Sequence, residues 1–407
     1  MQSTRRLWLI AVGLSLCPAV TNGFARFAYG LVLPSMRDDL MWTYTQAGWI
    51  NTANAAGYLI GALAAWIAIP RLGVRRLFIA GMAVTAVALL LSALTRDFWM
   101  LVRWRILAGV GGAPAFIAGG ALASALFKGD NSRNALAIAV YFGGGGFGML
   151  LSGLGLPLML DRMGAAAWPQ AWLLLGAASC LAFLPSWWAV RALRLPAVAE
   201  LDRITTALPM RKMVPELAGY FLFAVGYIVY VTFIVAWMQT QDATAQLVAL
   251  TWSILGVAVM ASPFLWRRML TISKGGGALA LSCALTGTGT LLPLFLGGAV
   301  GLVLSAALFG VSFFIAPAAI TSFSRKNLLE TQWGTSVALF TTLFAIGQMV
   351  GPVAAGVIAD RTDSISLSLA GAGVTLLIAA IVATAQAPLS GHVLHARKVT
   401  LLPSNRP

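Results

Sequence analysis

Apolar residues occur along the chain in runs of about twenty, and short polar segments rich in arginine separate these runs. A helix needs about twenty apolar residues to cross the ~30 Å hydrocarbon core of a bilayer. Each run is therefore predicted to form one transmembrane helix. Twelve helices are expected, over residues 7–33, 45–69, 77–95, 100–126, 134–158, 170–190, 215–239, 244–266, 276–296, 299–323, 332–358 and 364–386.

The composition agrees with a membrane protein, because hydrophobic residues make up 59% of the 407 residues and charged residues only 10%. A soluble chain carries about a quarter charged residues. Backbone groups surrounded by lipid must form hydrogen bonds within their own segment, so runs of this length are expected to be helical. The alternating ten-residue pattern of a membrane β-barrel does not occur. We therefore predict an all-α membrane protein that spans the lipid bilayer.

Basic residues are distributed unevenly between the two sides of the predicted membrane. The formal net charge is +15, and 20 of the 27 Lys and Arg residues lie on the side that carries both termini, against four on the other. Basic residues concentrate in cytoplasmic loops, so we expect both termini in the cytoplasm and the protein in a bacterial inner membrane. The basic residues lie in short spacers rather than on one face, so the charge does not indicate a nucleic-acid partner.

The longest polar segment follows the sixth predicted helix and divides the chain into two similar halves. We expect a six-helix bundle over 1–190, a cytoplasmic linker over 191–214, a second six-helix bundle over 215–390 and a cytoplasmic tail over 391–407. A shift of 199 residues aligns the fifth predicted helix with the eleventh; the aligned pairs are Gly148 with Gly347, Asp161 with Asp360, and Arg162 with Arg361. Two repeated bundles are typical of transporters that bind substrate between the halves near the membrane midplane.

Several motifs resemble those of the major facilitator superfamily, and the resemblance extends over essentially the whole chain. The loop PRLGVRR (70–76) is similar to the family's basic loop motif, with Pro70 where the family usually has Asp. RILAGVGGA (105–113) matches the family's R-x-x-x-G signature in the fourth helix. The fifth helix is rich in glycine like the family's antiporter motif, but the Gly-Pro pair of that motif stands in the eleventh helix, as Gly351 and Pro352. The segment NGFARFAYGLVLPSMRDDL looks like a bacterial subgroup whose substrates are mostly unassigned. The resemblance implies two pseudo-symmetric six-helix bundles, alternating access and a monomer.

Two arginines lie well inside the predicted membrane helices. Arg26 is in the first helix and Arg105 in the fourth, and the resemblance implies that both helices line a central cavity. All twelve acidic residues fall in spacers or at helix ends, so no carboxylate is expected beside either arginine. A charge at membrane depth costs at least about 2.5–3.5 kcal/mol unless it is paired or hydrated. Because guanidinium binds carboxylate or phosphate in a bidentate manner, the pair predicts an anion site. The alternative for Arg105 is a structural role in which it ties its helix to neighbouring carbonyl groups.

Polar side chains recur at helical spacing around these arginines. In the first helix Asn22, Arg26 and Tyr29 are predicted to share one face, and in the second helix Asn51, Asn54 and Tyr58 are predicted to do so. The second half contributes aromatic and amide candidates, which are Tyr227, Phe313 and Gln348. Interhelical hydrogen bonds and core packing explain such residues as well as substrate contact does.

Other chemistry is not supported by the sequence. The three cysteines lie within apolar runs without the spacing of a metal site, and both histidines, His392 and His395, lie in the polar tail. The glycine run 143–146 is not preceded by a strand or followed by Lys-Ser/Thr, so close helix packing is favoured over a phosphate loop. No buried base is available to activate a serine. We expect neither an enzyme nor a metal or other cofactor.

These observations favour a transporter that moves a small organic anion by alternating access. Arg26, together with Arg105, is expected to neutralise the charge of a substrate bound between the bundles. The transporter is expected to be secondary active or facilitative. Proton coupling, as in a symporter, would involve the substrate's own acidic group or a helix-end carboxylate such as Asp97 or Asp360, which are the coupling or gating candidates. Facilitated diffusion or anion exchange would need neither. The alternative is a proton-coupled efflux pump for hydrophobic or cationic compounds, which the aromatic second half favours and the absence of a buried acid disfavours.

Overall fold

The computed structural model describes residues 3–127, 129–193 and 207–389, which form helices and turns with no β-strand. The first half contains α1 (Thr4–Pro18), a π-helix η1 (Ala19–Phe27), α2 (Tyr29–Leu40), α3 (Tyr44–Ser92), α4 (Phe98–Ala123), α5 (Asn131–Met163), a 3-10 turn η2 (Ala165–Ala167) and α6 (Trp168–Ala192). The second half contains α7 (Met210–Thr240), α8 (Ala245–Leu265), α9 (Arg267–Ile272), α10 (Gly277–Phe295), α11 (Gly298–Phe313), α12 (Ile315–Asn327), α13 (Glu330–Thr362) and α14 (Ile365–Thr384). The all-α prediction is confirmed.

Eleven helical segments of the described chain are long and apolar enough to cross a membrane, and the longest contains two crossings. α3 has 49 residues, which would span about 73 Å as one straight helix, more than twice a bilayer core. Gly73 interrupts it with φ 77° and ψ 154°, a conformation that glycine adopts without steric cost. The chain reverses there, so the segments make twelve crossings, as the apolar runs predict.

Short polar side chains fix where several of these helices begin. Thr43 caps α3 in a reciprocal capping box with Gln46. Asp97 caps α4 by accepting a hydrogen bond from the Met100 amide at 2.8 Å. The sequence suggests an ion pair between Asp97 and Arg103, and this is wrong: Arg103 Nη1 instead donates to the Met100 sulfur.

The first membrane crossing is not a regular α-helix. Its middle turn, Ala19–Phe27, is a π-helix in which the Ala28 amide donates to the Gly23 carbonyl five residues earlier, at 2.9 Å. A π turn contains more residues than an α turn, so side chains beyond it point in other directions than α spacing predicts. Asn22, Arg26 and Tyr29 consequently do not share one face.

The start of the seventh crossing also differs from the sequence prediction. α7 begins at Met210 rather than at 215, and this places Glu216 in the second turn of the helix, where it is buried. Glu216 thus lies near a helix end, as the sequence predicts, but inside the helix and buried. The predicted linker 191–214 overlaps the ends of α6 and α7, while its residues 194–206, like the tail 391–407, lie outside the described residues.

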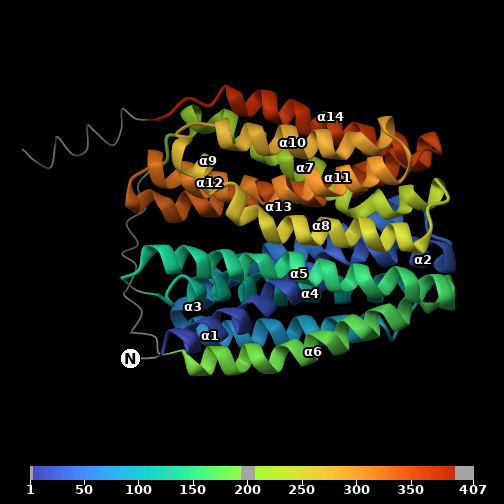
Figure 1. The fold of residues 1–407 in the computed structure, drawn as a ribbon, viewed down its shortest axis with the longest axis horizontal. Helices are drawn as coiled ribbons and strands as arrows, with labels where there is room; N and C mark the ends of the chain where they lie inside the picture. The colour runs from blue at the N-terminus through green and yellow to red at the C-terminus, as the bar shows by residue number, and fades with distance from the viewer. Residues whose placement is uncertain (1–2, 128, 194–206, 390–407) are drawn as a thin grey trace, which may run out of the picture.

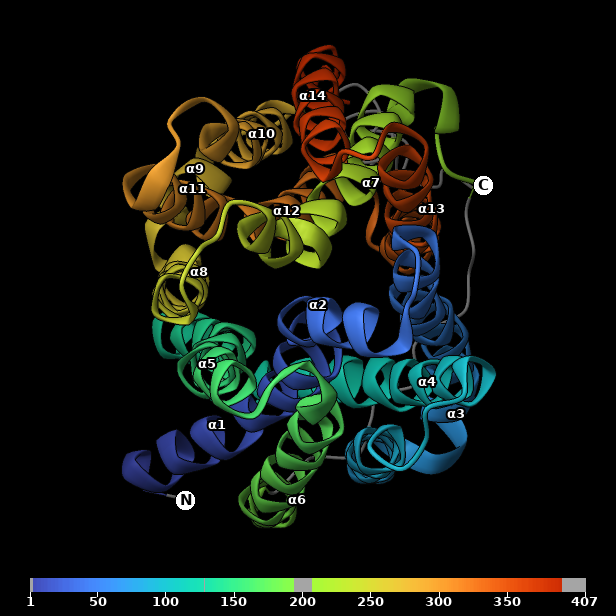
Figure 2. The same cartoon turned by 90° about the vertical axis from the view of Figure 1, so that its right-hand side faces the viewer.

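The helices form two bundles that lie side by side, α1–α6 in one and α7–α14 in the other (Figure 1). We name the two ends of the molecule by the chain: the terminal side carries the start of α1 and the end of α14, and the distal side carries the turns at 41–43 and 363–364. Figure 2 looks from the distal side along the helices and shows α5 beside α8 and α3 beside α13 at the boundary between the bundles.

The internal repeat of the sequence is also visible in the helix boundaries. α13 begins and ends 199 residues after α5, and each helix has 33 residues. Glycines allow close packing on both: a Cβ on Gly146 of α5 would lie 2.5 Å from the Gly256 carbonyl of α8, and one on Gly351 of α13 would lie 2.4 Å from the Val225 carbonyl of α7. Small residues are what allow helix backbones to approach within a membrane.

Candidate functional site

A chain of hydrogen bonds joins the two bundles at Arg26. The side chain projects from the π-helix, is 6% exposed, and donates through Nη2 to Gln348 Oε1 on α13. Gln348 Nε2 in turn donates to the hydroxyl of Tyr227 on α7. The guanidinium carbon of Arg26 also lies 5.1 Å from the centre of the Tyr58 ring on α3. One arginine from the first bundle therefore contacts an amide and a phenol network in the second.

The π-helix that carries Arg26 packs closely on α5. A Cβ on Gly23 would lie 2.6 Å from the Cα of Gly148, so glycine at both positions is needed for this approach. The backbone of the π-helix is held by the close contact on α5, and its Arg26 side chain bonds to the second bundle. The sequence run around Gly148 thus serves packing, as its lack of a phosphate-loop context predicts.

Aromatic rings of the second bundle form a continuous wall beside this network. Tyr227 stacks on Phe223, Phe313 and Phe344 at ring-centre distances of 5.1, 5.7 and 5.6 Å. Phe27 of the π-helix meets Phe313 edge-on at 5.9 Å, so the wall also touches the first bundle. A guanidinium beside stacked rings suits a ligand with an anionic group and a flat apolar body.

No carboxylate in the described part of the chain pairs with Arg26. The three ion pairs found there are all partly exposed and peripheral: Arg37 with Asp38, Arg96 with Asp39, and Arg133 with Asp130. The carbonyl oxygen of Gln348 is polar but uncharged, so it solvates the guanidinium without neutralising it. An ionisable residue buried in a membrane helix is by default a candidate functional residue, and a positive charge without a counter-ion attracts an anion.

Arg105 lies in a different environment, within the first bundle. It is 1% exposed, its Nη2 donates to the Ala25 carbonyl at 2.5 Å, and its guanidinium carbon lies 5.5 Å from the Tyr29 ring and 4.8 Å from the Trp172 ring. Its Nε and Nη1 have no hydrogen-bond partner among the described residues. Each of these contacts belongs to the first bundle, which corresponds to the structural alternative weighed for this residue.

The remaining polar candidates divide between the boundary and the bundle interior. Asn51 Nδ2 donates to Thr232 of α7 at 2.5 Å and so crosses between the bundles. Asn54 donates to the Arg105 carbonyl, and the Tyr29 hydroxyl donates to the Ala47 carbonyl at 2.7 Å; both bonds stay inside the first bundle. Asn22 is buried close to α5 and forms no side-chain hydrogen bond within the described chain.

The two carboxylates expected to act in coupling or gating differ in their contacts. Asp97 only caps its own helix. Asp360, at the distal end of α13, accepts hydrogen bonds from the amides of Tyr44 and Thr45, at 2.8 and 2.9 Å, across the boundary between the bundles. These amides open the first turn of α3, where the partial positive charge of the helix dipole attracts an anion. Asp360 therefore fastens the two bundles together on the distal side.

Sequence reasoning missed several residues at this boundary. Phe223 and Phe344 each lie four residues before a predicted site residue, Tyr227 and Gln348, so helical spacing alone could have found them. Thr232 gives no comparable signal. It contributes through a hydroxyl that faces Asn51, and only the relative position of α3 and α7 reveals this.

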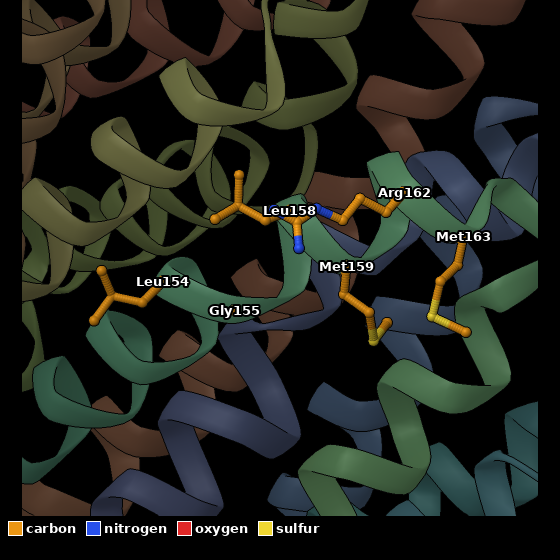
Figure 3. Close-up of a pocket in the computed structure, with 6 residues that line it drawn as sticks. All are labelled: Leu154, Gly155, Leu158, Met159, Arg162 and Met163. Carbon is orange, nitrogen blue, oxygen red and sulfur yellow. The ribbon is translucent and has the colours of Figure 1, made fainter.

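The pocket drawn in Figure 3 is separate from this network. It has a volume of about 360 Å³ and is lined only by α5 residues, which are Leu154, Gly155, Leu158, Met159, Arg162 and Met163 (Figure 3). None of the residues predicted to bind substrate lines it.

Comparison with known proteins agrees with this architecture. The structure superposes on that of a mutant of the nucleoside transporter NupG with a TM-score of 0.69 and 13% sequence identity, covering 91% of this chain and 99% of that one. A likeness at this identity shows the fold alone. Comparison with curated protein sequences gave no match.

Fold and family together define the class: the chain is an integral membrane transporter of the major facilitator superfamily and not an enzyme. Within it, the chain belongs to the family of the uncharacterised MFS-type transporter YbfB, whose model matches residues 18–384. A transporter of this family moves a small molecule.

Proposed function

We propose that the protein transports a small organic anion with an apolar or aromatic body, bound between the bundles by Arg26. The observation that carries this proposal is the buried guanidinium of Arg26, which has no counter-ion in the described chain and bonds only to the neutral Gln348. A carboxylate that replaced the Gln348 oxygen would neutralise the guanidinium charge and could bind it in a bidentate manner, which the amide oxygen cannot do.

The aromatic wall supplies the rest of the proposed binding surface. The stacked rings of Tyr227, Phe313 and Phe344 lie on the opposite side of the boundary from the π-helix. A substrate held at one end by Arg26 would lay its apolar body along these rings. Both bundles would then contribute to one site, which is what alternating access between two rocking halves requires.

Contacts between the bundles support the interpretation that the distal side is closed in this conformation. Asp360 bonds to the start of α3, Thr52 donates to the Met349 carbonyl at 2.7 Å, and a Cβ on Gly48 would lie 2.4 Å from the Pro352 carbonyl. These contacts lie in the distal halves of α3 and α13. The terminal half of α13 instead exposes successive residues, among them Gly334, Thr335, Val337 and Ala338. We assign the structure to a state open toward the terminal side.

We further propose that the terminal side faces the cytoplasm of a bacterial inner membrane, and that the protein works as a monomer. The 20 to four distribution of basic residues supports this orientation. The state would then be inward-facing.

Efflux of hydrophobic or cationic compounds is the second candidate function, and the aromatic wall favours it. Rings stacked around Tyr227 attract cations through their faces. The positive charge of Arg26 beside Tyr58 opposes a cation at the same place. An uncharged aromatic compound could stack on the rings of the wall but would leave Arg26 without a counter-ion.

The test is the melting temperature of the purified protein with matched panels of small organic anions and lipophilic cations. A ligand that binds only the folded state at ~100 times its Kd stabilises that state by about 2.7 kcal/mol. We expect carboxylates to raise the melting temperature of the wild type and to lose this effect in Arg26→Gln. Arg103→Gln is the matched control, because Arg103 is exposed and its side chain donates to the Met100 sulfur rather than to a group of the second bundle. Cations that stabilise wild type and Arg26→Gln equally would contradict the proposal and favour efflux.

A further inference from the structure

Glu216 is the one buried acidic side chain in the described part of the chain. It lies in the second turn of α7 and is 1% exposed. Tyr227, the α7 residue of the network around Arg26, lies about three turns further along the same helix. Neither of its carboxylate oxygens has a hydrogen-bond partner among the described residues. Every other described acid is at least partly exposed.

The chain that follows α14 is hydrogen-bonded to the backbone of α7 at Glu216, on the terminal side of the molecule. Gln386 Oε1 accepts the Glu216 amide at 3.2 Å, while Gln386 Nε2 donates to the Lys212 carbonyl at 3.0 Å. The Gln386 carbonyl accepts the Gly276 amide at the start of α10, at 3.0 Å. Three further residues along, the Leu389 amide donates to Asn327 Oδ1 at 2.7 Å. We call residues 386–389 the cover segment.

Among the described residues, the surroundings of Glu216 offer no charge that pairs with its carboxylate. On α10 the nearest titratable group is the thiol of Cys283, and α14 presents Ala383, seen in its contact with Gly219 of α7. On α7 itself Lys212 lies one turn earlier and makes no hydrogen bond to the Glu216 oxygens. The basic Lys326 of α12 is exposed and donates to carbonyls at the end of α9, and Glu330 of α13 is exposed.

An ionised carboxylate in such a place would be strongly unfavourable. Burial of an unpaired charge costs so much that the group takes up a proton and becomes neutral instead. In a membrane helix an ionisable residue of this kind is by default functional, and proton relays are one of the roles it serves. Burial without a partner therefore favours the neutral form of the Glu216 side chain over the ionised one.

We propose that Glu216 is a proton-binding site of this transporter, neutral while the cover segment lies over it and open to exchange with the terminal-side solution when that segment moves away. The carboxylate takes up one proton on closure and releases it on opening. Its role in transport rests on the proposed function, but the binding of the proton does not depend on which substrate is carried. Asp97 and Asp360, in contrast, are exposed and already serve as helix caps.

Melting temperature as a function of pH tests proton binding without a substrate. Glu216 would be protonated in the folded protein and ionised in the unfolded chain, so the folded state binds the extra proton and loses stability as pH rises. Between about pH 6 and about pH 9, wild type should lose several degrees more than Glu216→Gln. Glu330→Gln, which removes an exposed acid, should follow the wild-type curve. Parallel curves for wild type and Glu216→Gln would overturn the proposal.

A measurement on the wild type keeps the test valid if Glu216→Gln does not fold. Dicyclohexylcarbodiimide adds the O–H of a protonated carboxyl group across its C=N bond, and mass spectrometry of peptides locates the adduct. We expect modification of Glu216 at about pH 6 that declines toward about pH 9, with Glu330 unmodified. Modification confined to exposed acids would overturn the proposal.

Transport separates this inference from the proposed function. In liposomes, an anion that stabilises the protein should accumulate when a pH gradient is imposed on the wild type. Glu216→Gln should lose this accumulation while retaining exchange of the anion down its own gradient. Accumulation by Glu216→Gln equal to wild type would overturn a coupling role. If no anion moves through the wild type, the proposed function fails, while the pH dependence of melting still decides whether Glu216 binds a proton.

Discussion

Arg26 of the first bundle donates a hydrogen bond to Gln348 of the second, and no carboxylate of the described chain shares the bond. The contact joins the bundles through a charge that is solvated but not neutralised. Under the proposed function, an anion that replaces the Gln348 oxygen would break this contact. Ligand binding would then remove a hydrogen bond that holds the two bundles together.

Gln348→Glu should turn this contact into an internal ion pair. A carboxylate at the Gln348 position would neutralise Arg26 and compete with any anionic ligand. We expect a higher melting temperature without ligand and an anion affinity lower by roughly tenfold or more, equivalent to about 1.4 kcal/mol. Gln239→Glu, at an exposed position on α7, is the control. Unchanged anion affinity in Gln348→Glu would show that Arg26 does not bind the ligand.

Arg105→Gln should affect stability rather than binding. Loss of the Arg105 guanidinium leaves the Ala25 carbonyl without its donor and removes contacts with Tyr29 and Trp172. A buried carbonyl without a partner costs about 1–3 kcal/mol. We expect a lower melting temperature and an anion-induced rise of the same size as in wild type, with Arg103→Gln close to wild type in both. A selective loss of the anion effect would place Arg105 in the binding site.

Asp360→Asn should loosen the distal side. The amide side chain is uncharged, so the attraction to the first turn of α3 is weakened by about 1 kcal/mol, enough to change a two-state population roughly fivefold. The rate at which a maleimide reagent modifies Thr52→Cys, in a Cys180→Ala background, reports opening. Asp363→Asn, which alters an exposed acid nearby, should leave the rate unchanged. Equal rates in all three proteins would exclude Asp360 as a fastening of the bundles.

Gly48→Ala should have a similar effect by a steric route. The added methyl group would lie 2.4 Å from the Pro352 carbonyl, a backbone atom that cannot give way without moving α13. We expect faster modification of Thr52→Cys and a lower melting temperature. Gly155→Ala is the control, since a methyl group there meets nothing within 4 Å. If both variants behave alike, the close approach at Gly48 does not keep the distal side closed.

Apolar run lengths were sufficient to predict the twelve crossings, since membrane thickness alone fixes how many residues each needs. Five residues chosen from the sequence, Arg26, Tyr58, Tyr227, Phe313 and Gln348, lie together at the boundary between the bundles. Their positions within the predicted membrane helices and their helical spacing were visible in the sequence. These two properties place their side chains at a similar depth in the membrane.

Other features depend on backbone geometry and tertiary contacts that spacing does not encode. Tyr29 turns toward Ala47 because the π-helix before it changes the register of the first crossing. Glu216 lies buried inside α7 because the helix starts earlier than its apolar run suggests, and the cover segment is hydrogen-bonded to its backbone amide. The repeat aligns Asp161 with Asp360. The Asp161 side chain is exposed and forms no hydrogen bond or ion pair within the described chain, whereas the Asp360 side chain bonds to α3.

The π-helix has a mechanical consequence for the first membrane crossing. Its hydrogen bonds run from an amide to the carbonyl five residues earlier, and π-helical stretches of this kind are rare and are frequently found at functional sites. If these bonds changed to the α-helical pattern, the two ends of the first crossing would rotate relative to each other, and Arg26 would move around the helix axis. Arg26, the residue proposed to bind the ligand, lies within this π-helix, so a change of hydrogen-bond register on ligand binding would also reorient the first membrane crossing.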